Sequence, residues 1–338
     1  MTLTDLGWSD HFARQFSADD TLTPARVSTV HRDLVDLLAP DGPLRLHSGL
    51  PTSALTSGDW VLHDGTRVTR RLAPRTEIAR RGAGDVADRQ LVVSNIDTLG
   101  IVTSCNADFN VARLERYLAL AASADCLPLV VLTKADLCDD PRSCQRRAEA
   151  LSPLVTALTV DARASDEALR LGPWCGPGQT LALVGSSGVG KTTLQNRLTG
   201  VEEATSGIRE DDAKGRHTTT YRALRRTVTG GWLIDTPGMR ELGLADAEDG
   251  IDRVFSDIAD LAGTCRFRDC RHESEPGCAI QGAIAEGSLD PARLARWQKL
   301  KREDLYNSET IAETRTRHRQ RQELYAHGKA RSKAKRGG

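Results

Sequence analysis

The chain has 338 residues, more than one ordinary domain needs, and 46 basic side chains balance 46 acidic ones to a formal net charge of zero. It contains no apolar run of about 18 residues and no continuous apolar segment near its amino terminus, which predicts neither a membrane span nor a secretory signal. The eight cysteines indicate buried thiols and a possible metal site rather than a disulfide framework. Together these features favour a cytoplasmic protein.

The amino-terminal quarter predicts a short extension and then a small β-domain. Residues 1–24 contain one candidate amphipathic helix around Trp8–Phe16. Several short β-favouring runs follow, separated by turn signals such as Asp41-Gly42-Pro43: Arg26–Val30, Leu44–Leu46, Trp60–His63 and Thr66–Leu72. This spacing favours a barrel or sandwich, with an OB-type barrel as one candidate. A group of arginines could make one face of it basic, or could be ordinary surface charge: Arg67, Arg70, Arg71, Arg75, Arg80 and Arg81.

From about Arg89 the pattern changes to strands alternating with helices. Continuous apolar strands of this kind predict an α/β domain whose parallel sheet is covered on both faces. A hairpin is expected to add strands after the fourth run, and helices to continue beyond Leu244. The expected strands are Leu99–Thr103, Leu127–Leu132, Ala157–Val160, Thr180–Val184, Tyr221–Val228 and Trp232–Ile234, and the expected helices are Val111–Ala122, Thr193–Leu198, Ile251–Leu261 and Pro291–Tyr306.

A phosphate-binding loop follows the strand Thr180–Val184. The segment matches the pattern G-x-x-x-x-G-K-[ST] without a gap and leads into a helix. Its glycines allow backbone N–H groups to face phosphate oxygens, Lys191 supplies a charge near the β- and γ-phosphates, and Thr192 offers a hydroxyl to Mg²⁺. The expected nucleotide-binding residues here are Gly185, Ser186, Ser187, Gly188, Val189, Gly190, Lys191, Thr192 and Thr193.

Asp235-Thr236-Pro237-Gly238 comes directly after the short strand Trp232–Ile234. An aspartate at the end of a strand beside a phosphate loop can hold the shell of Mg²⁺, and the N–H of Gly238 can approach a γ-phosphate. Without the phosphate loop the tetrapeptide would predict only a turn.

Thr133-Lys134-Ala135-Asp136 follows the strand Leu127–Leu132 and indicates that the base is guanine. The Asp136 carboxylate can accept hydrogen bonds from N1–H and the exocyclic amine of guanine, a donor pair that adenine lacks. Lys134 would lie along the base. The motif usually begins with Asn, so Thr133 keeps an oxygen but loses the amide. After Ala157–Val160, the backbone N–H of Ala162 could contact guanine O6.

Four potential metal ligands lie close together near the carboxyl end: Cys265, Cys270, His272 and Cys278. Three thiolates and an imidazole form a closed tetrahedral set, which predicts one structural zinc ion and no open position for metal catalysis. The other five cysteines are scattered along the chain. Reduced thiols in a loop are the alternative interpretation.

The order of these motifs is unusual, since the base-recognition motif precedes the phosphate loop instead of following it. The chain therefore looks like a circularly permuted GTPase, which is possible because domain termini often lie close together. Apart from its first 20 or so residues and its last 30, the chain resembles the ribosome small subunit-dependent GTPase A family (RsgA, also called YjeQ). The resemblance rests on Gly58-Asp59-Trp60-Val61, Asn95-Ile96-Asp97, Arg116-Tyr117-Leu118, Thr133–Asp136, Gly185–Thr192, Gly215–Thr220, Asp235–Gly238 and the cysteine cluster.

The resemblance implies an OB-fold, a permuted GTPase domain and a zinc domain. The corresponding divisions are an extension at 1–24, a barrel at 25–88, the GTPase domain at 89–248, the zinc domain at 249–306 and a basic tail at 307–338. It also implies a role late in small ribosomal subunit maturation, contact with 16S rRNA, and hydrolysis of GTP to GDP stimulated by that subunit. No membrane partner is expected, and a monomer is expected.

By the same resemblance Thr218 and Thr219 belong to a switch segment, with Thr219 a candidate ligand of Mg²⁺ alongside Thr192 and Asp235. Many GTPases carry a water-orienting glutamine after the aspartate motif, where this chain has Met239. Slow intrinsic turnover is therefore expected. His217 is the candidate that positions the attacking water, although a lone histidine is as often an ordinary surface or core residue.

Two other functions remain open from the sequence. One is an ATP-using phosphate-loop protein with a nucleic-acid-binding zinc module, which equal binding of ATP and GTP would favour. The other is a nucleotide-gated RNA-binding scaffold whose hydrolysis is incidental. Between Arg315 and Arg336 the tail is almost uniformly basic, which suits a polyanion such as RNA but also a merely solubilising tail.

Overall fold

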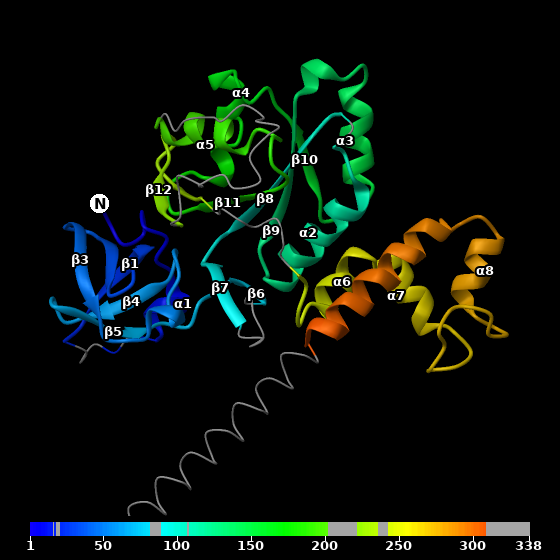
Figure 1. Ribbon diagram of the computed structural model, residues 1–338, viewed down its shortest axis with the longest axis horizontal. Coiled ribbons are helices and arrows are strands. Elements are labelled where there is room, and N and C mark those ends of the chain that lie inside the picture. Colours follow the sequence, from blue (N-terminus) through cyan, green and yellow to red (C-terminus); the bar gives the residue numbers. More distant parts are fainter. Residues whose placement is uncertain are drawn as a thin grey trace, which may run out of the picture.

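In the computed structural model, a small barrel, a central sheet with its helices and a carboxyl-terminal group of helices follow one another along the long axis of the molecule (Figure 1). The structure describes residues 1–15, 17, 21–81, 89–106, 108–201, 222–235 and 243–308. The predicted His217, Thr219 and Gly238 lie outside the described residues, as does the basic tail from residue 309 onward.

Five strands close into a barrel in the order β1-β2-β3-β5-β4, with β4 pairing back to β1 and β3 running parallel to β5. This confirms the predicted OB-type barrel. Side chains such as Val35 and Leu37 alternate into its core. Because Leu34 and Leu38 place apolar side chains on the other face of β2, alternation is weak there, and that strand was not predicted. The strands are β1 Thr23–Val30, β2 Leu34–Ala39, β3 Gly42–Ser48, β4 Trp60–His63 and β5 Arg67–Arg71, with a 3-10 turn at Thr52–Ala54.

A short helix, α1 (Asp10–Ala13), packs against this barrel. The ring of its Phe12 lies 5.7 Å from that of Trp60, and Trp8 meets Trp60 edge-on at 4.8 Å. The helix is shorter than the predicted span Trp8–Phe16, and Phe16 itself lies outside the described residues.

The central sheet has the strand order β10-β9-β8-β11-β13-β12, and all pairings are parallel except that of the edge strand β12. Both faces are covered, as predicted. Ile101 and Val130 share a core with α2, while Val102 and Val131 share another with α5. The elements are β8 Thr98–Ser104, α2 Val111–Ser123, β9 Leu127–Thr133, α3 Pro141–Glu149, β10 Thr156–Thr159, α4 Ser165–Leu169, β11 Thr180–Val184, α5 Lys191–Thr199, β12 Leu224–Arg226 and β13 Trp232–Ile234, with 3-10 turns at Ala135–Leu137 and Gly172–Trp174.

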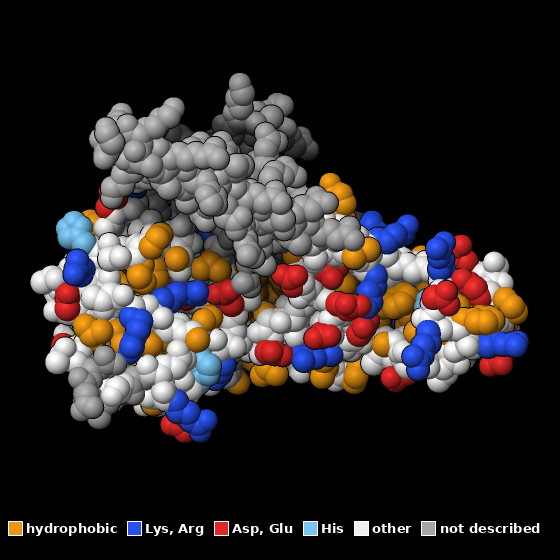
Figure 2. Space-filling view, turned by 90° about the horizontal axis from the view of Figure 1, so that it is seen from below, with side chains coloured by type: hydrophobic (Ala, Val, Ile, Leu, Met, Phe, Trp, Pro, Cys, Tyr) orange, Lys and Arg blue, Asp and Glu red, His pale blue; other side chains and the backbone are white. Residues whose placement is uncertain are grey.

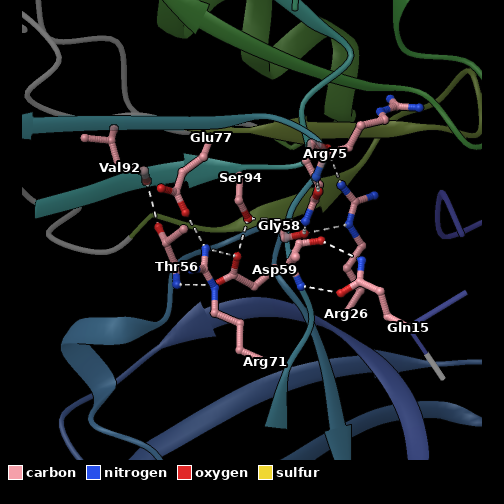
Figure 3. Close-up of polar contacts among 12 residues, drawn as sticks. Gln15, Arg26, Thr56, Gly58, Asp59, Arg71, Arg75, Glu77, Val92 and Ser94 are labelled. Carbon is pink, nitrogen blue, oxygen red and sulfur yellow. Dashed lines mark hydrogen bonds and ion pairs between the residues drawn. The ribbon is translucent and has the colours of Figure 1, made fainter. Parts of the chain in front are cut away.

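A two-stranded ribbon, β6 (Glu77–Arg81) with β7 (Arg89–Ser94), links the barrel to this sheet. A buried polar network fixes the junction (Figure 3). The Asp59 carboxylate, fully buried, accepts bonds from Arg71 at 2.8 Å and from the Ser94 hydroxyl at 2.5 Å. Burial raises the pKa of Asp59 although Arg71 pairs with it. Gly58 is required here, since a Cβ would lie 2.0 Å from the Ser94 carbonyl oxygen.

Several of the arginines that were candidates for a basic face on the barrel pair with acidic side chains. Arg71 also bonds Glu77 at 2.7 Å, Arg75 pairs with Asp97, and Arg67 lies 3.6 Å from Asp64. Figure 2 shows one face of the molecule on which acidic and basic side chains are interspersed. On that face, the described part of the barrel carries scattered basic side chains rather than one continuous patch.

The carboxyl-terminal helices are α6 Glu248–Val254, α7 Ser256–Gly263, α8 Ala279–Ala285 and a helical stretch at residues 291–308. The predicted helix Ile251–Leu261 is thus two helices that meet at Phe255, whose φ of −108° and ψ of 42° interrupt the first. Buried Ile251 and Ile258 join the same core as Leu118 of α2. Among the described residues, no helix is long and apolar enough to cross a bilayer.

Candidate nucleotide site and metal centre

The strand order creates a topological switch point at the carboxyl ends of the central strands. The chain builds β8, β9 and β10 outward in one direction and then returns to add β11 on the other side of β8. Connections therefore leave in opposite directions at the carboxyl ends of β8 and β11, which is where open α/β sheets bind ligands. The three predicted motifs at Thr133, Gly185 and Asp235 all stand at carboxyl ends of strands on this edge.

The loop between β11 and α5 has the backbone of a phosphate cradle. Gly185 has a φ of 143°, and a Cβ there would lie 2.1 Å from the carbonyl oxygen of Val102 on the neighbouring strand. Only glycine fits so close an approach. Val189 is buried and Ser187 exposed, while Thr192 and Thr193 are half-buried on the first turn of α5. The amino terminus of α5 thus faces the loop, with backbone donors available to an anion.

Lys191 lies inside this loop rather than in solvent. Its Nζ donates to the carbonyl oxygen of Gly185 at 2.8 Å and also to that of Ser186. The Ser186 hydroxyl accepts a bond from Arg113, near the start of α2, and Arg113 pairs with Asp108 at 2.8 Å. Arg113 was not predicted from the sequence, because only the strand order brings α2 beside the loop.

Thr133, at the end of β9, contacts the phosphate loop directly. Its side chain is completely buried, and its hydroxyl donates to the carbonyl oxygen of Val189 at 2.6 Å while lying 3.1 Å from that of Thr103. A Cβ at Gly190 would lie 3.7 Å from Thr133 and 3.7 Å from Ala162. The upstream segments and the downstream loop therefore converge at one place in the fold.

Asp136 stands just outside this point, with a side chain 39% exposed. Its Oδ2 accepts a bond of 2.6 Å from Nη2 of Arg163. The Asp161 carboxylate also accepts two hydrogen bonds from Arg163, one from Nε at 3.3 Å and one from the backbone N–H at 2.9 Å. Lys134 is half-buried with a left-handed φ of 55°, so the chain turns sharply between Thr133 and Asp136.

Asp235 directly follows the strand β13, and its Oδ1 accepts a bond of 2.7 Å from the Gln195 side chain of α5. Gln195 lies one helical turn beyond Lys191 and Thr192. The carboxylate is therefore fixed beside the helix that carries the predicted Mg²⁺ ligand Thr192. Gln195 had no signature in the sequence, since its partner lies 40 residues away.

A second set of ligands gathers in the carboxyl-terminal region. One donor atom each from Cys265, Cys270, His272 and Cys278 lies within 4.8 Å of the others. His272 Nδ1 is 3.6 Å from the sulfur of Cys265 and 3.7 Å from that of Cys278, and these two sulfurs are 3.9 Å apart. Ligands around a tetrahedral zinc ion with Zn–S bonds of about 2.3 Å stand about 3.8 Å apart. The donor set fits such an ion.

Comparison with known proteins identifies the family. A sequence model of the RsgA GTPase family matches residues 72–245. The small ribosomal subunit biogenesis GTPase RsgA of Mesorhizobium japonicum is 49% identical over 316 residues, which cover 91% of this chain and 91% of that protein. The corresponding RsgA 2 of Vibrio parahaemolyticus is 46% identical over 324 residues, covering 94% and 90%. This chain belongs to the RsgA GTPase family.

Solved structures confirm the fold of this RsgA GTPase. YjeQ from Thermotoga maritima superposes with a TM-score of 0.61 at 21% identity, over 84% of this chain and 99% of that one. YloQ, described as a circularly permuted GTPase, gives 0.57 at 20% identity, over 88% and 96%. The predicted permuted α/β fold is therefore confirmed, and family membership makes the chain a GTP-hydrolysing enzyme of the phosphate-loop class.

Proposed function

We propose that this RsgA GTPase binds GTP with Mg²⁺ between the phosphate loop and the segment Thr133–Asp136. In this proposal it hydrolyses GTP to GDP and phosphate during late maturation of the small ribosomal subunit, and the subunit stimulates hydrolysis. The observation that carries the nucleotide site is the bond from the Thr133 hydroxyl to the Val189 carbonyl oxygen. It supports a single pocket in which a base and its phosphates can be held together.

In this pocket Asp136 accepts two hydrogen bonds from guanine, Lys134 lies along the base, and the N–H of Ala162 donates to O6. Asp136 and Ala162 come from neighbouring strands β9 and β10, whose ends share one edge of the sheet. An adenine base would leave the carboxylate unpaired, so guanine is selected.

Backbone N–H groups from Gly185 to Gly190 and the start of α5 hold the phosphates. When the nucleotide binds, Lys191 gives up its hydrogen bonds to the carbonyl oxygens of the loop and donates to phosphate oxygens instead. Mg²⁺ would be held by Thr192 and Thr219, and Asp235 would bind water molecules of its coordination shell. The ion would neutralise negative charge that develops on the phosphates. His217 positions the attacking water, and Gly238 donates to the γ-phosphate.

The cysteine cluster holds one structural zinc ion through Cys265, Cys270, His272 and Cys278. All four positions of a tetrahedral ion are then filled, so its role is to stabilise the fold of this region. Backbone N–H groups of Ala279 and Ile280 lower the pKa of Cys265 although burial opposes them, which favours the thiolate that zinc requires.

Curated relatives carry the name small ribosomal subunit biogenesis GTPase. The proposed partners of this chain are accordingly the small subunit and its 16S rRNA, met by the barrel, the zinc region and the basic tail. The division into 1–24, 25–88, 89–248, 249–306 and 307–338 belongs to the same proposal, as do a monomeric state and a cytoplasmic location.

The deciding experiment measures turnover of GTP and of ATP, each with and without purified small ribosomal subunits. We expect turnover with GTP only, slow for the protein alone and at least tenfold faster with subunits. Equal turnover of both nucleotides would favour the ATP-using alternative. A Lys191→Ala variant should lose turnover, and if it still supports subunit maturation, the protein acts as an RNA-binding scaffold.

A further inference from the structure

The carboxylate proposed to read guanine has a partner within the chain. Nη2 of Arg163 donates to Oδ2 of Asp136 at 2.6 Å, although the two residues are 27 positions apart and follow different strands. Asp161 orients the arginine from behind, because it accepts both from the backbone N–H at 2.9 Å and from Nε at 3.3 Å. These two bonds to Asp161 hold the Arg163 side chain in the direction of Asp136.

A guanidinium group resembles the edge of guanine that Asp136 would read. Both present coplanar N–H donors on either side of one carbon atom, at a spacing that matches the two oxygens of a carboxylate. Guanine offers N1–H and its exocyclic amine in this way, whereas adenine does not. Arg163 uses one of its donors, Nη2, on Oδ2 of Asp136, so a guanine base that pairs with both oxygens of the carboxylate must compete with it for Oδ2.

We infer that Arg163 competes with guanine for Asp136 and occupies this carboxylate until a guanine base displaces it. The inference rests on the proposed function, in which Asp136 reads guanine. In the free protein the arginine satisfies the carboxylate. In the nucleotide complex its bond to Asp136 is replaced by those of the base, and Arg163 turns toward Asp161 and solvent.

The size of the effect follows from exposure. The side chains of Arg163 and Asp136 are 69% and 39% exposed, so solvent screens their attraction. Exposed pairs of this kind change an equilibrium by about 1.4- to 5-fold. Arg163 should therefore weaken guanine binding by that factor, and the weakening should lie in the association rate, because only the empty site is blocked.

The test compares binding of GDP to the full chain and to Arg163→Ala, by stopped-flow fluorescence of a ribose-labelled GDP. We expect association about 1.4 to 5 times faster in the variant, an unchanged dissociation rate and correspondingly tighter binding. Arg163→Lys keeps the charge without the planar fork and should fall between the two. Equal or slower association in Arg163→Ala would overturn the inference, as would faster dissociation, which would mean that Arg163 holds the bound base.

Two further variants separate this inference from the proposed function. Arg146→Ala removes an exposed arginine of α3 that lies 3.5 Å from Asp140, and should leave GDP binding unchanged. Asp136→Asn should weaken GDP binding strongly and abolish the gain from Arg163→Ala. If Asp136→Asn has no effect on GDP binding, the proposed base recognition fails. If it weakens binding while Arg163→Ala changes nothing, only the present inference fails.

Discussion

Thr133 shows how one side chain can replace another in a motif without loss of its structural task. Its short hydroxyl reaches the carbonyl oxygens of Val189 and Thr103, so it ties β9 to the phosphate loop and to β8. An asparagine at this position would offer an amide for the same purpose. The departure from the usual motif therefore changes the donor group and retains the connection between base and phosphate segments.

Replacing Thr133 by Val tests this connection, because valine keeps the shape and removes the hydroxyl. The buried carbonyl of Val189 would lose its donor, at a cost of about 1–2 kcal/mol in the free energy of unfolding. GDP affinity should fall several-fold because the loop is less firmly placed. Urea unfolding and GDP titration measure the two effects. Thr156→Val, at an exposed position on β10, is the control, and equal GDP affinity in both variants would contradict the role given to Thr133.

At this scale the sequence predicted residues whose chemistry is carried by a local motif, such as Lys191 and the four potential metal ligands of the cysteine cluster. It did not predict Arg113, Gln195 or Arg163. Each of these acts on a partner 27 to 73 positions away, and that proximity exists only once the strands are ordered in the sheet. No local pattern records it.

At the scale of elements, burial decided what could be predicted. Strands β9 and β11 are continuous apolar runs enclosed on both faces, and their positions agree with expectation. The ribbon β6–β7 was missed because Glu77–Arg81 is dominated by charged residues. Glu77 is paired with Arg71 of the barrel, a distant partner that the local composition does not reveal, so the segment resembles a loop in its sequence.

We expect the proposed zinc ion to contribute more than packing to the order of the loop that carries the cysteine cluster. Few buried apolar side chains lie between Thr264 and Gly277, among the described residues, so the ion is expected to hold this loop in place. Cys270→Ala should release zinc and increase hydrogen exchange across residues 263–280. Metal analysis together with hydrogen exchange measures this, and Cys138→Ala, outside the cluster, is the control. Stoichiometric zinc retained in Cys270→Ala would contradict the ligand set.

At the scale of the whole molecule, Arg26 joins three parts of the chain. This barrel arginine is 1% exposed and donates to the carbonyl oxygens of Leu6 at 2.6 Å and Asn95 at 2.8 Å, and to the hydroxyl of Thr180 at 2.9 Å. Burial lowers the pKa of Arg26 to about 10, so it is still charged at neutral pH. Thr180 begins β11, the strand that leads into the phosphate loop, so the barrel is anchored to the base of the nucleotide site.

Replacing Arg26 by Ala should therefore uncouple the barrel from the GTPase sheet. Several buried acceptors would lose their donor, which should destabilise the junction by about 3–5 kcal/mol. We expect urea unfolding, followed by tryptophan fluorescence, to divide into two transitions with the barrel unfolding first, since Trp60 of β4 is buried in the apolar cluster shared with the ribbon β6–β7 and so reports on the junction. Arg32→Ala, an exposed arginine of the same barrel, should leave unfolding unchanged. Because β11 keeps its pairings with β8 and β13, Arg26→Ala should still bind GDP, and a single transition at the original midpoint would show that the junction does not depend on this side chain.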